Sequence, residues 1–138
     1  MFKVVNYSII KTKPISFTWV FRYKIDEDGY LKSFKSRIYV RGDLQPPSEK
    51  DMYAATFTSK SLRILLAVII RWDLEARQLD AVNAFPNIKL DEVVYIELFD
   101  RFKIPGKIAF LLQALYGLRR SPLLWQRLFT EALITLGF

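Results

Sequence analysis

The sequence contains no cysteine and no histidine among its 138 residues. The first absence excludes disulfide bonds and thiolate-bound metals, and the second excludes Ser-His and Cys-His catalytic dyads and imidazole-bound zinc. Catalysis by this chain would therefore rest on carboxylates and a hard metal ion, for which 14 Asp and Glu residues are available as ligands.

Long apolar runs are absent as well. The run Ile64–Ile70 is bounded by Arg63 and Arg71, so it falls short of the roughly 18 residues that a membrane-spanning helix needs. Residues 1–7 have neither the sustained apolar core nor the small-residue cleavage site of a signal peptide. We therefore expect no membrane span and an intracellular location, in the cytoplasm or the nucleus. The hydrophobic content of 51% is ample for the core of one domain.

Negative charge is scarce at both ends of the chain. Residues 1–50 carry ten Lys or Arg against five Asp or Glu, residues 51–100 carry five against eight, and residues 101–138 carry six against one. An acidic middle between two basic flanks suits a site in which carboxylates bind a metal ion and the surrounding Lys and Arg residues bind phosphate groups. A solvated basic surface is the alternative that the same distribution allows.

Residues 19–41 predict a β-hairpin with one aromatic and one basic face. Apolar and other side chains alternate from Trp19 to Ile25, which is the period of a half-buried strand. The segment Asp26–Gly29 supplies the turn. On the return strand one face carries Tyr30, Phe34, Ile38 and Val40, and the other carries Lys35, Arg37, Tyr39 and Arg41. Cations on a rigid ribbon meet a triphosphate without first being ordered, so the hairpin suits nucleotide binding.

Two amphipathic helices complete an α+β pattern. The first begins at Thr58 or Ser59, and we expect its apolar face to be buried and to brace the central strand; this face consists of Leu62, Leu65, Leu66, Ile69 and Ile70. The second opens at Pro122. Short strands are expected at residues 93–97 and, at a sheet edge, near residues 108–112.

The run Arg77–Phe85 sets one carboxylate, Asp80, into an apolar segment that we interpret as this central strand. An isolated ionised carboxylate there costs several kcal/mol unless it is solvated, paired or bound to a metal. Asp80 is therefore either an acid facing a wet cleft or a member of a surface ion pair. Asp91 and Glu92 are expected to be solvated acids of the following turn.

The motifs around Asp80 resemble the reverse transcriptases of copia-type LTR retrotransposons. In that family a strand Q-[LM]-D-V-x-x-A-F, here Gln78–Phe85, precedes an acidic Y-[IM]-E strand, here Val93–Glu97. A later Y-G-L-[KR]-x-S-P-x-x-W motif stands at Tyr116–Trp125, and a K-A-R-L-V strand at Lys35–Tyr39. The resemblance implies a fingers β-hairpin plus a partial antiparallel palm sheet packed with helices. It divides the chain into a poorly ordered lead-in, residues 1–15, and a partial polymerase domain, residues 16–138.

The resemblance also implies roles for individual residues. Asp80 is the implied catalytic residue, and it would hold Mg²⁺, or Mn²⁺, together with the carbonyl group of Ala81. The implied nucleotide-binding residues are Lys35, Arg37, Ala81, Asn83, Ala84, Phe85, Tyr116 and Gly117, with Phe85 as the steric gate against a 2′-OH. The implied template-binding residues are Arg22, Arg41 and Pro122. An RNA template, a DNA primer and deoxynucleoside triphosphates are the implied partners.

The sequence departs from the family pattern in several places. Pro86 follows the gate and is expected to hold Phe85 in an extended conformation, and Phe99 and Arg101 replace the Pro and Gly of a P-x-G-F turn. The chain ends before the Y-x-D-D strand, which carries further carboxylates in the family. We therefore expect a chain that is inactive alone and that self-associates through an open sheet edge. The alternative is a non-catalytic, basic, nucleic-acid-binding remnant of a transposable element.

Overall fold

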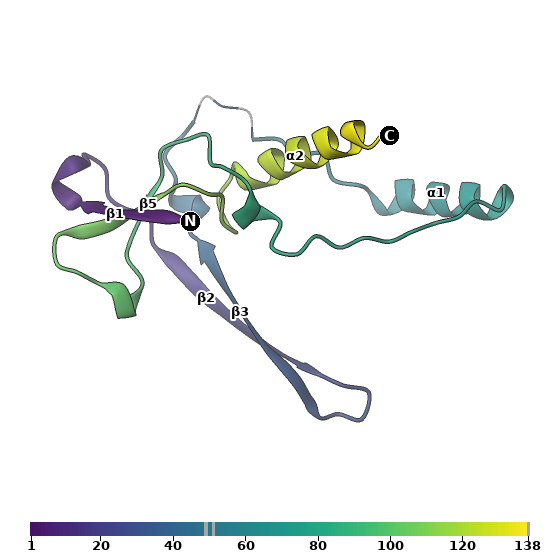
Figure 1. The fold of residues 1–138 in the computed structure, drawn as a ribbon, viewed down its shortest axis with the longest axis horizontal. Coiled ribbons are helices and arrows are strands. Elements are labelled where there is room, and N and C mark those ends of the chain that lie inside the picture. Colours follow the sequence, from purple (N-terminus) through teal and green to yellow (C-terminus); the bar gives the residue numbers. More distant parts are fainter. Residues whose placement is uncertain (49, 51, 138) are drawn as a thin grey trace.

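A computed structural model describes residues 1–48, 50 and 52–137. The fold combines a two-stranded antiparallel sheet, a three-stranded antiparallel sheet and two α-helices, which confirms the α+β expectation. Figure 1 shows the two-stranded sheet projecting from the rest of the chain as an arm, with the two helices on another side.

The arm is the predicted hairpin, formed by β2 (Phe17–Ile25) and β3 (Leu31–Val40). The register pairs Arg22 with Lys35 and is shifted by an irregularity between residues 24 and 25. Asp26 closes the turn, because its Oδ1 accepts hydrogen bonds from the backbone N–H groups of residues 28 and 30 at 3.1 and 2.8 Å. Gly29 takes the left-handed conformation there, with φ 87°.

The three-stranded sheet has the order β1-β5-β4, with β1 at Phe2–Asn6, β5 at Lys107–Leu111 and β4 at Tyr95–Ile96. Two sequence expectations differ from this arrangement. The stretch 1–15 contains a paired strand where an irregular lead-in was expected, and β5 is central where an edge strand was expected. The reason is that β1 pairs with a strand about 100 residues later in the chain. A run of five residues is too short for its periodicity to indicate a strand or its distant partner.

The core lies where the base of the hairpin meets the three-stranded sheet. Its largest fully buried apolar side chains, Ile96 and Leu111, come from β4 and β5. Phe99 joins the two sheets, because its ring lies 4.8 Å from that of Phe17 and 5.8 Å from that of Phe2. This departure from the family pattern is therefore a core residue, only 8% exposed.

Helix α1 (Ser59–Arg71) begins as predicted, with the hydroxyl of Thr58 accepting a hydrogen bond from the N–H of Ser61 at 3.1 Å. The predicted burial of its apolar face is wrong, because no residue of α1 is buried. Helix α2 (Ser121–Thr135) carries Pro122 in its first turn, as expected. No helix within the described ranges is long and apolar enough to cross a membrane.

The central strand predicted around Asp80 is not formed. Residues 74–81 have no regular secondary structure, and no described strand pairs with them. Leu79 and Val82 are 88% and 80% exposed. A strand is stabilised by hydrogen bonds to a neighbour, and an alternating pattern without that neighbour leaves an extended, solvated segment.

Candidate nucleotide-binding site

The ring of Tyr116 is the meeting point of three segments. The guanidinium carbon of Arg37, on β3, lies 5.8 Å from the centroid of this ring. The ring of Phe85 meets it edge-on at 4.8 Å, and the ring of Tyr39 lies at 5.5 Å. The structure therefore brings together three residues that the sequence nominated for nucleotide binding, Arg37, Phe85 and Tyr116. A cation over an aromatic face is attracted by about 0.5–1 kcal/mol at an exposed site.

The loop that carries Tyr116 is fixed against the end of β3. The carbonyl oxygen of Tyr116 accepts a hydrogen bond from the N–H of Val40 at 2.8 Å. The next residue, Gly117, has φ 89°, and a Cβ atom there would lie 2.1 Å from the carbonyl oxygen of Val40. A Cβ atom on Gly42 would lie 2.0 Å from the carbonyl oxygen of Gly117. Only glycine at both positions allows this crossing, which joins the hairpin to the loop that carries Tyr116.

Phe85 is positioned by a short 3-10 helix, Phe85–Asn87. The expectation that Pro86 holds Phe85 extended is wrong, because Phe85 begins this helix and Pro86 occupies its first turn, where a missing N–H is tolerated. The amide of Asn87 donates to the carbonyl oxygens of Val82 and Asn83 at 3.3 and 3.1 Å. These bonds hold the preceding turn, in which Asn83 has φ 51°.

The remaining implied residues of this segment are not among the side chains that meet at Tyr116. The implied metal ligands Asp80 and Ala81 are exposed. Of the implied nucleotide-binding residues beside them, Asn83 is exposed and Ala84 is half-buried. Within the described part of the chain, no group of three or more acidic side chains could hold a metal ion. A two-ion polymerase site needs several carboxylates, so the donor set of these residues does not fit such a site.

The other implied contacts are spread along the hairpin and beyond it. Arg22 and Lys35 are cross-strand partners further along the arm than Arg37. Arg41 pairs with Asp43, with Nη2 and Oδ2 2.6 Å apart. This hydrogen bond lowers the pKa of the Asp43 carboxyl and raises that of Arg41. Pro122 is exposed at the start of α2.

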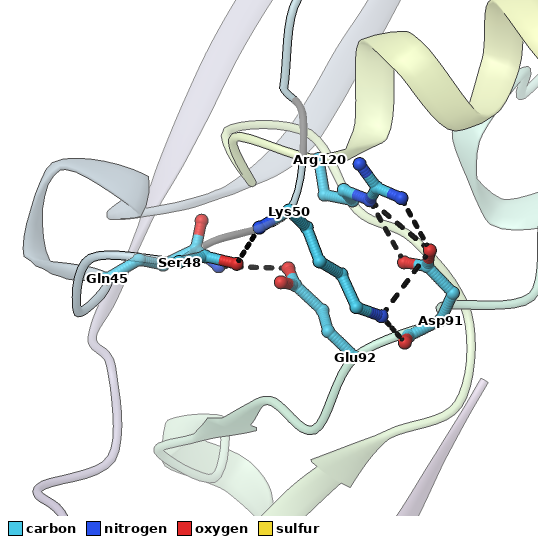
Figure 2. Close-up of polar contacts among 6 residues, drawn as sticks. All are labelled: Gln45, Ser48, Lys50, Asp91, Glu92 and Arg120. Carbon is cyan, nitrogen blue, oxygen red and sulfur yellow. Dashed lines mark hydrogen bonds and ion pairs between the residues drawn. The ribbon is translucent and has the colours of Figure 1, made fainter.

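Beside the Tyr116 loop lies a polar cluster that sequence reasoning missed, which we call the clamp: Gln45, Lys50, Asp91, Glu92 and Arg120 (Figure 2). The guanidinium of Arg120 donates hydrogen bonds to the Asp91 carboxylate, from Nη2 to Oδ2 at 2.8 Å and from Nε to Oδ1 at 3.2 Å. The Arg120 side chain is only 5% exposed. The hydrogen bond from Arg120, aided by the charge of Lys50, lowers the pKa of the Asp91 carboxyl.

The clamp corrects the expectation that Asp91 and Glu92 are solvated turn acids. Glu92 accepts a hydrogen bond from the amide of Gln45 at 3.2 Å, and Lys50 donates to the backbone oxygen of Asp91. Gln45 in turn accepts from the N–H of Arg119 at 2.9 Å. The clamp therefore ties the turn after β3 to both the residue 91–92 turn and the Tyr116 loop. No local pattern could have revealed it, since Asp91 and Arg120 are 29 residues apart.

Comparisons with known proteins agree with the motifs. The sequence profile of the family described as reverse transcriptase (RNA-dependent DNA polymerase) matches residues 1–138. The chain is 32% identical over 118 residues to the retrovirus-related Pol polyprotein from transposon TNT 1-94 of Nicotiana tabacum, covering 82% of the chain. The Pol polyproteins from transposons RE1 and RE2 of Arabidopsis thaliana are 35% and 34% identical, over 87% and 96% of the chain. The chain spans 8–10% of the length of these relatives. No solved structure matches it.

Proposed function

Because the chain belongs to the reverse transcriptase (RNA-dependent DNA polymerase) family, whose profile matches all of its residues, we propose that it forms the fingers hairpin and the first part of the palm of a copia-type retrotransposon polymerase. In this proposal the side chains that meet at Tyr116 bind a deoxynucleoside triphosphate, and an RNA template and a DNA primer are the partners of the chain. These partners place it inside the cell, in the cytoplasm or the nucleus. The observation that carries the proposal is the convergence of Arg37, Phe85 and Tyr116 from three separate segments.

In this proposal the triphosphate is held mainly by the hairpin. Arg37 reaches the phosphates from above the Tyr116 ring, and Lys35 assists from further along β3. A guanidinium fork matches the oxygens of a phosphate group, and its charge strengthens each hydrogen bond. Backbone groups of Ala81, Asn83, Ala84 and Gly117 face the same nucleotide.

The edge-on pair of rings, Phe85 and Tyr116, sets the shape of the proposed sugar site. Phe85 is half-buried and meets Tyr116 edge-on, so its position is fixed by packing. A rigid ring beneath the sugar leaves no room for a 2′-OH, which favours deoxynucleotides over ribonucleotides. Arg22, Arg41 and Pro122 are the proposed template contacts.

The proposed metal ligands are Asp80 and the carbonyl of Ala81, with Mg²⁺ or Mn²⁺ as the ion. The donor set of the described residues does not fit a two-ion site. The lack of a fitting donor set among the described residues also supports a second candidate function, a non-catalytic module that binds nucleic acid through its basic hairpin.

Self-association is also proposed, because apolar side chains of α1 and of residues 79–82 face solvent.

We expect the alanine variant of Arg37 to bind a deoxynucleoside triphosphate about tenfold more weakly than the unchanged chain, since a charge-assisted hydrogen bond is lost. The measurement is displacement of a fluorescent triphosphate analogue. Lys24→Ala is the matched control, because it removes the same charge from the same face of the hairpin, opposite Ser33 and away from Tyr116. An equal loss of triphosphate affinity in both variants would contradict a specific role for Arg37 and would show that any positive charge on this face has the same effect.

We also expect the chain alone to extend no primer on an RNA template with Mg²⁺ or Mn²⁺, because one exposed carboxylate cannot hold two ions. The measurement is incorporation of a labelled deoxynucleotide by the purified chain. Incorporation that disappears in Asp80→Ala would contradict this expectation and would show that the described donor set suffices.

A further inference from the structure

Gln45 is a buried amide side chain that contacts two distant parts of the chain. It follows the short 3-10 helix Gly42–Leu44 beyond the end of β3 and is only 7% exposed. Its Oε1 accepts a hydrogen bond from the N–H of Arg119 at 2.9 Å, and its Nε2 donates to Oε1 of Glu92 at 3.2 Å (Figure 2). A backbone N–H can only donate and an ionised carboxylate can only accept. The two partners together therefore fix which way the amide points.

These two contacts join the three segments that supply the side chains converging at Tyr116. Arg37 lies on β3, which leads into the turn that carries Gln45. Phe85 begins the segment that leads to Glu92, and Tyr116 opens the loop that contains the donor N–H. One side chain is thus hydrogen-bonded to both of the other segments, and it holds all three at a common point.

The Tyr116 loop is anchored on both sides of Gly117. On one side, the carbonyl oxygen of Tyr116 accepts a hydrogen bond from the N–H of Val40 at 2.8 Å. On the other side, the N–H of Arg119 donates to Gln45. Glycine is conformationally permissive, so one anchor alone would leave the loop free to change direction at Gly117. The bond to Gln45 removes that freedom.

The side chain of Arg119 makes a further contact that does not replace this anchor. Its Nη2 donates to the carbonyl oxygen of Asp43 at 3.1 Å. Arg119 is exposed, and a long exposed side chain has many rotamers, so this contact holds the backbone only loosely. The bond from the N–H of Arg119 to Gln45 acts on the backbone of the loop itself.

We propose that Gln45 is a positioning residue for the triphosphate site, which fixes the edge-on pair of Phe85 and Tyr116 and so sets the discrimination against a 2′-OH. The inference rests on the proposed function and deepens it, because it assigns sugar selectivity in part to a side chain of the clamp. The two rings belong to the segments that Gln45 joins through Glu92 and Arg119. A ring excludes a 2′-OH only while its position is fixed, and small displacements of a positioned group have large effects.

The two bonds of Gln45 can be changed separately by substitution. Gln45→Leu removes both bonds. Gln45→Glu keeps the side-chain volume and the acceptor for Arg119, but it sets a second carboxylate against Glu92, and two carboxylates at this distance repel each other. Adding Glu92→Gln to Gln45→Glu reverses the pair. The amide at position 92 then donates to the carboxylate at position 45, which still accepts from Arg119, so this double variant restores both bonds.

The test compares the affinity of each variant for a deoxynucleoside triphosphate and for the matching ribonucleoside triphosphate, by displacement of a fluorescent triphosphate analogue. We expect Gln45→Leu and Gln45→Glu to bind the deoxynucleotide about three- to tenfold more weakly, which is the effect of one net hydrogen bond. Their preference for the deoxynucleotide should fall about threefold or more. The reversed pair should restore both quantities. A purely structural role would lower both affinities equally through the folded fraction and would leave the preference unchanged.

Gln126→Leu is the matched control. Gln126, on α2, also accepts a hydrogen bond from a distant backbone N–H, that of Ala55 at 3.0 Å, but this contact does not involve the Tyr116 loop. Its replacement should leave the deoxynucleotide preference unchanged, and an equal change in both leucine variants would overturn the proposal. Circular dichroism checks the folding of each variant. If Gln45→Leu does not fold, Gln45→Glu and its reversed pair still provide the test.

Hydrogen exchange at the N–H of Arg119 tests the anchor without any ligand. We expect faster exchange in Gln45→Leu than in the unchanged chain, slow exchange again in the reversed pair, and continued protection of the N–H of Val40 in all of them. Exchange at Arg119 that is equal in Gln45→Leu and the unchanged chain would overturn the inference. So would a chain that binds triphosphate and keeps its deoxynucleotide preference in both Gln45 variants, and the proposed function would then stand. An unchanged chain that binds no triphosphate would overturn the proposed function and this inference with it.

Discussion

Replacement of Gly117 by alanine is expected to lower the free energy of unfolding by at least about 3 kcal/mol. The new methyl carbon would lie 2.1 Å from the carbonyl oxygen of Val40, and the backbone has φ 89°. The contact is with backbone, so no side-chain rotation relieves it and the crossing of β3 with the Tyr116 loop must open. The loop places Tyr116 against Arg37, so triphosphate binding should be lost with it. Denaturant unfolding followed by circular dichroism measures the change.

Gly106→Ala is the matched control for this substitution. Gly106 also has a positive φ, 71°, but a Cβ atom there meets nothing within 4 Å. Its replacement should therefore cost only the backbone strain, about 1–2 kcal/mol. Gly42→Ala tests the steric term without positive φ, since its methyl carbon would lie 2.0 Å from the carbonyl oxygen of Gly117. Losses of equal size in Gly106→Ala and Gly117→Ala would show that the crossing is not tightly packed.

Substitution of Asp91 by asparagine is expected to lower the free energy of unfolding by about 2–3 kcal/mol. Removal of one partner leaves the Arg120 charge, 5% exposed, without its carboxylate. Fully buried pairs lose about 3–5 kcal/mol in this way, and the effect here is smaller because the Asp91 side chain is 37% exposed and solvent screens it. The second substitution Arg120→Met should restore part of the loss, since it removes the buried charge that has lost its hydrogen bonds to Asp91. Denaturant unfolding of the single and double variants measures this coupling.

Acidification should reproduce the effect of the Asp91 substitution. The pKa of Asp91 is lowered from its ordinary value of 3.8 by the hydrogen bond from Arg120. The folded state therefore binds this proton less readily than the unfolded state. The stabilisation is present above pH 3.8 and is lost as the pH falls through the lower pKa of the folded state. The free energy of unfolding should fall less steeply in this range for Asp91→Asn.

Asp43→Asn is the control for the clamp. It breaks the Arg41–Asp43 pair, whose side chains are 50% and 59% exposed. Exposed pairs contribute little to stability, so a much smaller loss is expected. A loss as large as that of Asp91→Asn would contradict the special role assigned to the buried Arg120.

Features encoded over a few neighbouring residues were predictable from the sequence. The β2–β3 hairpin follows from strict alternation around the Asp26–Gly29 turn, and the capping hydroxyl of Thr58 and the position of Pro122 mark the two helix starts. The nucleotide-site residues could be nominated because they sit in short motifs. Their convergence at Tyr116 fits that nomination, although the binding roles themselves stay predictions.

The prediction failed where a pattern needed a partner. The alternation around Asp80 predicted a strand, and the apolar stripe of α1 predicted a buried face, yet both segments face solvent. A periodic pattern states which side of a segment can be buried, and it does not state what lies against that side. Both interpretations assumed a neighbour that the described residues do not provide.

The sequence by itself determined the family, the hairpin with its two unlike faces, the helix starts and the nomination of Arg37, Phe85 and Tyr116, because each depends on local spacing and local side-chain chemistry. Only the tertiary structure decided that β1 closes onto β5, that Phe99 joins the two sheets and that Asp91 meets Arg120. These contacts join residues far apart in the chain, and their stability comes from burial and charge pairing. Burial and pairing exist only after the chain has folded back on itself, so no local pattern encodes them.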